Sequence, residues 1–201
     1  MAVVVSVARR CDAIGLRGVL AMRQWIVLCA VVIVLAGCSS SGRTITVRGH
    51  NMENTLQPGQ RLHLRIATAS YAPAVGDIVE FKMPATWDPA QREAISRVVA
   101  TGGQTVRGIA DKVQVSTDNG RTYRTLDEPY VRLDGPDFNG ADFRPVTVPP
   151  GRLWLMGDHR NDSLDSRFHC APPGTPPDPA VACDPMDSTV PASSVEGYRR
   201  G

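Results

Sequence analysis

"VPPGRLWLMGDHRNDSLDSR", residues 148–167, joins an apolar run to a long polar one. The apolar part, residues 151–157, is rich in β-prone side chains and lacks the 3.6-residue period of an amphipathic helix. Charged and hydroxyl residues follow at once, as is typical where a buried strand enters a loop. The stretch therefore predicts a strand that ends in a polar loop.

Short segments of the same kind recur after Arg43. The segment "RLHLRIA", residues 61–67, alternates clearly, with Leu62, Leu64 and Ile66 expected on one face. With 16 prolines, 18 glycines and no long segment of helical period, the chain is predicted to be a mostly β domain rich in turns. The other expected strands are "RTITV" (43–47), "DIVEF" (77–81), "AISRVVAT" (94–101), "KVQVS" (112–116) and "RTYRTL" (121–126) around the hairpin signal "TDNG", and "SSVEGYRR" (193–200).

The composition gives no reason to expect a nucleic-acid ligand. The 201 residues carry a net charge of +2, and the length favours one domain. Lys82 and Lys112 are the only lysines among 22 basic residues, which matters for any mechanism that needs a lysine.

The N-terminal segment is typical of an export signal. Residues 25–36, "WIVLCAVVIVLA", are twelve apolar residues, too few for a membrane span of about 20 but suited to the core of a signal peptide. Arg23 supplies the preceding positive charge. The run ends in "LAGC", which resembles the bacterial lipobox, so Cys38 is expected to be lipidated. "SSSGR", residues 39–43, follows as a polar tether.

These features predict three parts: a signal segment over residues 1–38, the tether, and an exported domain over residues 44–201. The alternative is a single uncleaved N-terminal membrane anchor, and Met22 is a second candidate for the start of translation. Both place the domain at the extracytoplasmic face of the cell membrane.

Two of the five cysteines lie together near the C-terminus. Cys170 and Cys183 flank a proline-rich loop, and outside the cytosol such a pair favours a disulfide, with two free thiols as the alternative. Closing that loop contributes about 3 kcal/mol in the chain-entropy description. Only His169 lies near these cysteines and there is no CxxC spacing, so we expect no metal site.

Five motifs occur in an order that resembles the type I signal peptidases, the bacterial serine–lysine leader peptidases. "GHNMENTLQPGQRL" (49–62) resembles the nucleophile motif GxSMxPTLxxGxxL, and "ISRVVATGGQTV" (95–106) resembles the lysine motif KRVxGxPGDxV. Residues 148–167 resemble the last motif, VPxGxxxxxGDNRxxSxDSR. "VGDIVEF" (75–81) and "LDEPYV" (126–131) match the two remaining ones. The resemblance implies a coiled β-sheet domain in its compact form, without a large second domain.

The family's chemistry is acyl transfer by a serine whose proton is taken by a neutral, buried lysine. In this chain Asn51 stands at the nucleophile position and Ser96 at the position of the base. A carboxamide does not form an ordinary acyl-enzyme, and a serine hydroxyl is no base near neutral pH. The resemblance therefore implies a member of the family with both catalytic groups substituted.

The surrounding motif residues are largely retained. By resemblance, Gly49 and Met52 belong to the oxyanion and groove region, and Asp158, Ser166 and Arg167 support the site from the last motif. Asn54 and Gln104 depart from the motifs, where the family has proline and aspartate.

Three functional hypotheses follow. The first is a catalytically inactive envelope lipoprotein that binds extended peptides, such as signal peptides or exported proteins. The second is an active peptidase with displaced residues, drawing on Lys82, or on Ser96 with His50 or His63 as its base. The third is a structural lipoprotein with a closed groove. Self-cleavage at Asn51 is a further, less favoured alternative. The expected partners are membrane lipid through Cys38 and peptides; no cofactor is expected.

Overall fold

The computed structural model describes residues 42–134, 142–171, 178 and 180–201. All of them belong to one compact unit, Ser41–Gly201, distinct from a unit Met1–Ser40. The expected signal segment, including Cys38, lies outside the described residues. Within the described residues, the structure contains no helix of the length and apolar character needed to cross a membrane.

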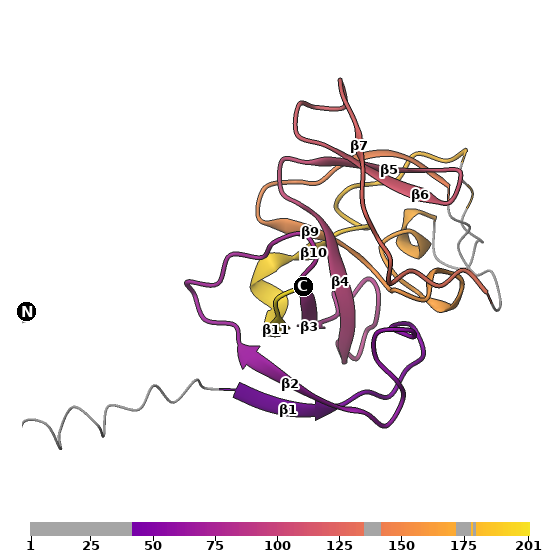
Figure 1. Cartoon of the computed structure of the whole chain (residues 1–201). Helices are drawn as coiled ribbons and strands as arrows, with labels where there is room; N and C mark the ends of the chain where they lie inside the picture. The colour runs from indigo at the N-terminus through magenta and orange to yellow at the C-terminus, as the bar shows by residue number, and fades with distance from the viewer. Residues whose placement is uncertain (1–41, 135–141, 172–177, 179) are drawn as a thin grey trace, which may run out of the picture. The chain divides into compact units, whose positions relative to one another are not determined.

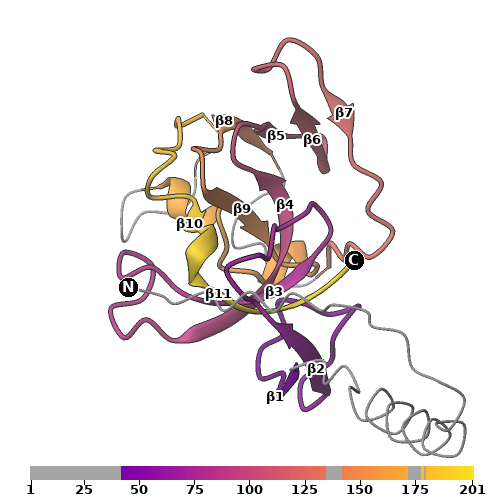
Figure 2. The same cartoon turned by 90° about the vertical axis from the view of Figure 1, so that its left-hand side faces the viewer.

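The described residues form two antiparallel sheets, as predicted for a mostly β domain (Figure 1). A seven-stranded sheet has the order β1-β2-β11-β3-β4-β9-β10, and a four-stranded sheet has the order β7-β6-β5-β8. Figure 2 shows β1 and β2 at the end of the domain opposite to β5, β6 and β7. The strands are β1 (Gly42–Thr46), β2 (Arg61–Ile66), β3 (Ile78–Lys82), β4 (Glu93–Thr101), β5 (Thr105–Ile109), β6 (Lys112–Ser116), β7 (Arg124–Thr125), β8 (Phe143–Thr147), β9 (Arg152–Met156), β10 (Val190–Pro191) and β11 (Val195–Arg199). Three single-turn 3₁₀ helices are η1 (Arg160–Asp162), η2 (Phe168–Cys170) and η3 (Ala192–Ser194).

The predicted alternation of β2 holds for two of its three apolar residues. Leu62 and Leu64 are buried, but Ile66 is 42% exposed. Ile66 is the last residue of β2, and its partner on β11 is Gly197, which has no side chain to cover it.

The first strand begins earlier than expected. The predicted strand, residues 43–47, contained Arg43 but not Gly42, which pairs with Arg65 and begins β1. The last two residues of the predicted tether, 39–43, therefore lie in this strand. A Cβ on Gly42 would lie 2.4 Å from the His63 imidazole, so glycine allows the two strands to approach here.

Three strands were not expected from the sequence: β5, β8 and β10. The first begins at the end of the lysine-type motif, residues 95–106, where Gly102 and Gly103 form a tight turn between β4 and β5. Gly103 has φ +88°, a conformation that favours glycine. The predicted hairpin around "TDNG" is present, although β7 is only two residues long.

One hydrophobic cluster joins the two sheets. Val99 and Trp154 from the large sheet pack with Val106 and Phe143 from the small one, and the Phe143 and Trp154 rings stack at 5.1 Å. A second cluster lies under the β1–β2 end, where Met52 and Leu56 of the connecting loop join the strand residues. These clusters hold the two sheets together and attach the β1–β2 loop to the domain.

A disulfide ties the C-terminal segment to η2, and an aromatic stack ties η2 to the loop between β3 and β4. Cys170 and Cys183, the pair for which we expected a disulfide, are bonded to each other. The neighbouring His169 stacks on Trp87 with ring centroids 4.1 Å apart, and burial lowers the pKa of His169 to about 4.

This buried imidazole makes stability depend on pH. The unfolded chain takes up a proton at His169 near its ordinary pKa of about 6.5, whereas the folded protein takes it up only near 4, so acid favours unfolding across that window. We predict that the free energy of unfolding falls by about 2 kcal/mol from this residue between about pH 7 and pH 5. Urea unfolding at both pH values should show a smaller fall for His169→Gln. An equal fall in wild type and variant would contradict the prediction.

Candidate functional site

The loop between β1 and β2, residues 47–60, is fixed from both ends. Val47 exchanges backbone hydrogen bonds with Gln60 and Gly59, which closes the base of the loop. Inside it, Met52 and Leu56 are fully buried and share a backbone bond of 2.8 Å. The hydrophobic anchoring of these two side chains sets the position of Asn51, which precedes them.

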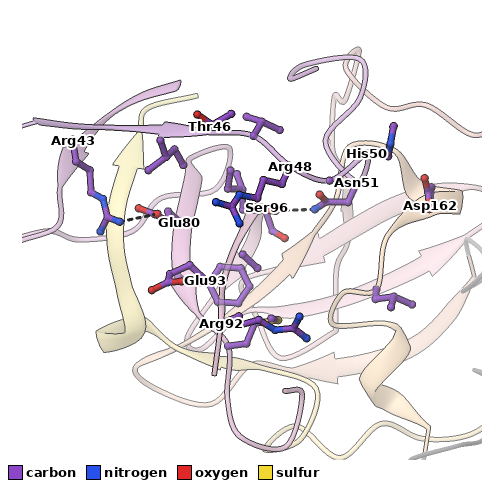
Figure 3. Close-up of a pocket in the computed structure, with 18 residues that line it drawn as sticks. Arg43, Thr46, Arg48, His50, Asn51, Glu80, Arg92, Glu93, Ser96 and Asp162 are labelled. Atoms are coloured by element: carbon purple, nitrogen blue, oxygen red, sulfur yellow. Dashed lines mark hydrogen bonds and ion pairs between the residues drawn. The ribbon is translucent and has the colours of Figure 1, made fainter. Parts of the chain in front are cut away.

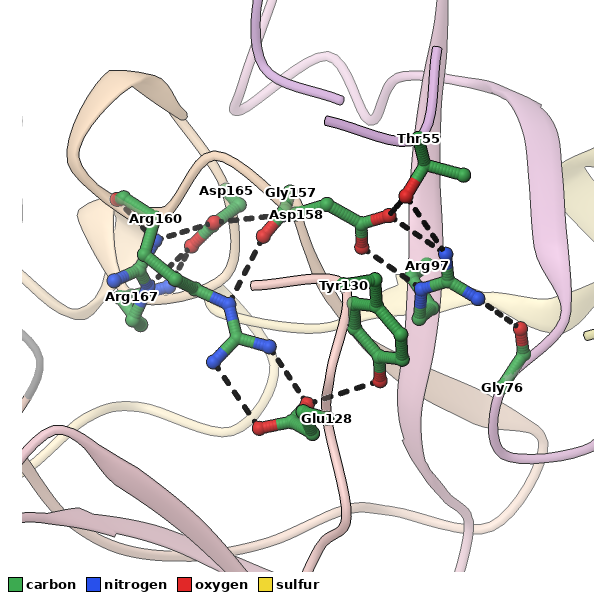
Figure 4. A network of polar contacts seen from close by, with 10 residues as sticks. All are labelled: Thr55, Gly76, Arg97, Glu128, Tyr130, Gly157, Asp158, Arg160, Asp165 and Arg167. Atoms are coloured by element: carbon green, nitrogen blue, oxygen red, sulfur yellow. Dashed lines mark hydrogen bonds and ion pairs between the residues drawn. The ribbon is translucent and has the colours of Figure 1, made fainter. Parts of the chain in front are cut away.

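A buried ion pair braces the same loop (Figure 4). Arg97 of β4 donates from Nε and Nη2 to the two carboxylate oxygens of Asp158, at 2.8 and 2.6 Å. Asp158 also accepts the hydroxyl hydrogen of Thr55 in the loop. Burial opposes the charged form of Arg97, but the hydrogen bonds and charge of Asp158 outweigh it and raise the pKa of Arg97. The arginine also stacks on Tyr130, 3.8 Å from the ring centre.

Asp165 and Arg167, from the end of the 148–167 motif, form a second buried polar cluster beside the first (Figure 4). Arg167 donates to both carboxylate oxygens of Asp165, at 2.9 and 2.8 Å. Burial raises the pKa of Asp165, but the Arg167 charge and hydrogen bonds outweigh it, so the net shift is downward. The hydroxyl of Ser166 accepts the Leu155 N–H at 3.0 Å. These bonds fold the polar loop back onto β9.

Gly157 explains how closely this motif approaches the β1–β2 loop. A Cβ at Gly157 would lie 2.4 Å from the backbone oxygen of Asn51 and 2.4 Å from Ser163 Oγ. The next contact reinforces the approach, because His159 donates its backbone N–H to the same Asn51 oxygen at 3.0 Å. The backbone of Asn51 is therefore fixed by the last motif.

Asn51 and Ser96, which the motif resemblance aligns with nucleophile and base, line one pocket (Figure 3). The pocket has a volume of about 870 Å³ and lies between β1, the β1–β2 loop and the first half of β4. Ser96 is 4% exposed. The lining residues are Arg43, Ile45, Thr46, Val47, Arg48, Gly49, His50, Asn51, Glu80, Phe81, Met83, Arg92, Glu93, Ala94, Ile95, Ser96, Asp162 and Leu164.

Among the residues that the structure describes, no strand pairs with the first half of β4 on the side that faces this pocket. Val98 exchanges backbone bonds with Gly76 and Asp77, on the β3 side of the strand. Since backbone groups of successive residues in a strand point to opposite sides, those of Glu93 and Ile95 point away from β3. On that side β9 pairs with β4 only from Arg97 onward.

β1 presents a similar edge. Val47 uses its N–H and C=O on the β2 side, so by the same alternation the backbone groups of Thr44 and Thr46 point away from β2. β1 is the last strand of its sheet, with β2 as its neighbour. Two strand edges therefore border the pocket, and each offers peptide N–H and C=O groups.

Asn51 makes a specific contact with the β4 edge. Its side-chain Nδ2 donates to the backbone oxygen of Ile95 at 2.7 Å. The carboxamide oxygen faces Gly49, where a Cβ would lie 3.2 Å away. The side chain is thus held between its own loop and β4.

One end of the pocket carries a charge cluster around the buried Glu80, which sequence reasoning missed. Arg43 pairs with Glu80 at 3.1 Å and with Glu196 at 2.9 Å. Glu80 is 4% exposed, and burial raises its pKa although the charge of Arg43 opposes this. The short run "DIVEF" contains this glutamate, and a charged residue inside an apolar run is the signal that would have found it.

Of the other residues that the sequence singled out as candidates for the site, some line the pocket and some do not. Gly49 lines the pocket, whereas the Met52 side chain lies in the core under the loop and is not among the lining residues. Lys82 and His63, considered as displaced bases, do not line the pocket. His50 does line it, but its Nδ1 lies 2.9 Å from the Glu53 carboxylate.

The family model described as "Signal peptidase, peptidase S26" matches residues 21–197. This chain belongs to the signal peptidase S26 family.

Relatives agree with this membership. The chain is 32% identical over 200 residues to a probable signal peptidase I of Mycobacterium leprae, with 79% of this chain and 67% of the relative covered. It is 30% identical over 225 residues to the signal peptidase I of Mycobacterium tuberculosis, with 89% and 71% covered. Among solved structures, a signal peptidase I from Enterococcus faecalis matches with a TM-score of 0.42 and 21% identity, over 64% of this chain and 97% of that one.

The Arg97–Asp158 pair gives a stability prediction. Removing one partner of a buried pair leaves an uncompensated charge and typically costs about 3–5 kcal/mol. We predict that Arg97→Gln lowers the free energy of unfolding by that amount in urea titrations. Arg92→Gln is the matched control, because Arg92 is 76% exposed in its pair with Asp88 and should cost at most about 1 kcal/mol. Equal losses for the two variants would contradict the structural role of the buried pair.

Proposed function

We infer that this signal peptidase family protein binds extended peptides at the outer face of the cell membrane without cleaving them. The observation that carries the proposal is that Asn51 and Ser96 border one pocket with two unpaired strand edges.

The chemistry of the two positions supports a non-catalytic role. Asn51 offers a carboxamide whose Nδ2 already bonds to Ile95, and Ser96 offers a hydroxyl that is no base near neutral pH. Losing one member of a catalytic triad typically leaves only about 10³–10⁴-fold acceleration over water, from binding and oxyanion stabilisation. With both positions substituted, ordinary processing of signal peptides is not expected.

The backbone edges support peptide binding by strand addition. A peptide lying between β1 and β4 would bond to the free backbone groups of Thr46 on one side. On the other side it would bond to the backbone groups of Glu93 and to the N–H of Ile95, whose carbonyl oxygen already accepts from Asn51. Apolar lining residues, among them Ile45 and Leu164, offer contacts for small alternating side chains. The family relationship makes signal peptides and exported proteins the leading candidate ligands.

The N-terminal sequence supports placement at the membrane. Cys38, the expected lipidation site, precedes the start of β1 at Gly42 by only a few residues. A lipid on Cys38 would therefore hold the β1 edge near the membrane surface, where signal peptides are displayed. An uncleaved N-terminal anchor in place of the lipid would have the same effect.

Binding without turnover is the direct prediction. The full-length chain should bind a labelled extended peptide with an Ala-x-Ala segment saturably in fluorescence anisotropy. Mass spectrometry after prolonged incubation should find that peptide intact. Cleavage that is lost in Ser96→Ala would contradict the proposal and favour a displaced catalytic centre, and no saturable binding would contradict the groove.

Restoring the dyad tests whether the pocket is still in register for catalysis. We predict that Asn51→Ser combined with Ser96→Lys gains cleavage of the same peptide, because position 96 is buried and burial lowers the pKa of a lysine toward neutrality. Each single variant is the matched control and should remain inactive. A double variant that folds and binds peptide but does not cleave would contradict the assignment of these two positions.

A further inference from the structure

The Asn51 side chain occupies a place that an added strand would need. A strand that pairs with β4 puts an N–H donor about 2.9 Å from the Ile95 carbonyl oxygen. Asn51 Nδ2 already stands at 2.7 Å from that oxygen. A peptide running along β4 from Glu93 therefore meets the carboxamide at Ile95 and cannot place its own backbone nitrogen there.

The charges on the two sides of Asn51 differ. Figure 3 shows Arg48 on the side of Asn51 toward Glu80 and Arg43, and Asp162 on the opposite side. All four of these charged residues line the same pocket. On the side of Asn51 where the β1 and β4 edges run, the nearest labelled charge is therefore the Arg48 cation. On the opposite side it is the Asp162 carboxylate.

Arg48 differs from the other two arginines of the pocket. Arg43 is paired with Glu80, and Arg92 is paired with Asp88. Among the described residues, no carboxylate lies within salt-bridge distance of Arg48, and its side chain is exposed at the pocket. It is therefore available to an anion from the ligand.

We propose that the pocket binds extended peptides that end at Asn51 with a free α-carboxylate. The carboxylate would accept the second Nδ2 hydrogen of Asn51 and a hydrogen bond from Arg48. This rests on the proposed peptide-binding function and specifies its ligand: the released product of a peptidase, with its new C-terminus, rather than an intact precursor whose chain continues past the same point.

The alternative ligand is an internal segment of a longer chain. Such a segment would have to displace the Asn51 carboxamide from Ile95 and then pass Asp162, and it would leave Arg48 without an anion. The free carboxylate meets neither obstacle. The two ligands can be told apart because they differ in one terminal charge and in length.

The test compares three labelled peptides that share one sequence ending in Ala-x-Ala: the free acid, its C-terminal amide, and a version extended by several residues. They are titrated against the full-length chain by fluorescence anisotropy. The free acid should bind at least about tenfold tighter than the other two, the effect of one charge-assisted hydrogen bond. Arg48→Gln should remove that preference. Arg61→Gln, an exposed arginine of β2 that does not line the pocket, should keep it.

The outcomes are distinct. Equal affinity for all three peptides would overturn this proposal while leaving the peptide-binding function intact. Absence of binding for all three would overturn both. A preference for the free acid that survives Arg48→Gln would overturn the assignment of Arg48. The Asn51→Ala variant should bind the lengthened peptide more tightly than the wild-type chain does, because the Ile95 carbonyl oxygen is then free to accept from the peptide backbone. No gain in affinity would contradict the role of Asn51 as the end of the groove.

Discussion

The buried pair of Arg97 and Asp158 is the constraint on which the site depends. It connects β4 to the loop after β9, and through Thr55 it also holds the β1–β2 loop. Arg97 further donates to the Gly76 oxygen at 2.8 Å, which adds the turn before β3. Four segments far apart in sequence are thereby held around one ion pair. Its net stabilising energy need not be large, but loss of either partner would leave a buried charge unpaired.

The consequence of this bracing is a pocket that keeps its shape independently of catalysis. Asn51 is positioned by the buried Met52 beside it and by the bond from the His159 backbone, and neither contact needs a serine. The carboxamide then bridges to the Ile95 oxygen, linking loop and strand where the family's chemistry would link serine to lysine. An asparagine at position 51 is thus compatible with an ordered pocket, which is the physical basis for proposing binding without cleavage.

Much of the fold was predictable because strand patterns are local. The alternation in "RLHLRIA" and the apolar run before Gly157 identified β2 and β9, and the ordered motifs identified the family. What escaped prediction depends on contacts between distant segments. β5, β8 and β10 are short and find their partners only in the assembled sheets, and the exposure of Ile66 follows from Gly197 on a strand more than 100 residues away.

In the site, too, the residues within local motifs were predictable, whereas those whose role depends on distant segments were not. The motifs pointed to Asn51, Ser96 and Gly49, and all three line the pocket. They did not point to the Ile95 carbonyl, because its exposure depends on where β9 stops pairing with β4. The motifs did not point to Glu80 or Arg48 either. Whether a charged side chain is paired, as Glu80 is with Arg43, depends on residues that only the folded chain brings close.

Amide hydrogen exchange on the full-length chain, with and without an Ala-x-Ala peptide, tests most directly whether an extended peptide adds to the β1 and β4 edges and stays intact. The account predicts slower exchange at Thr46, Glu93 and Ile95 when peptide is present, with the peptide recovered uncleaved. Unchanged exchange at these three amides under saturating peptide would contradict it.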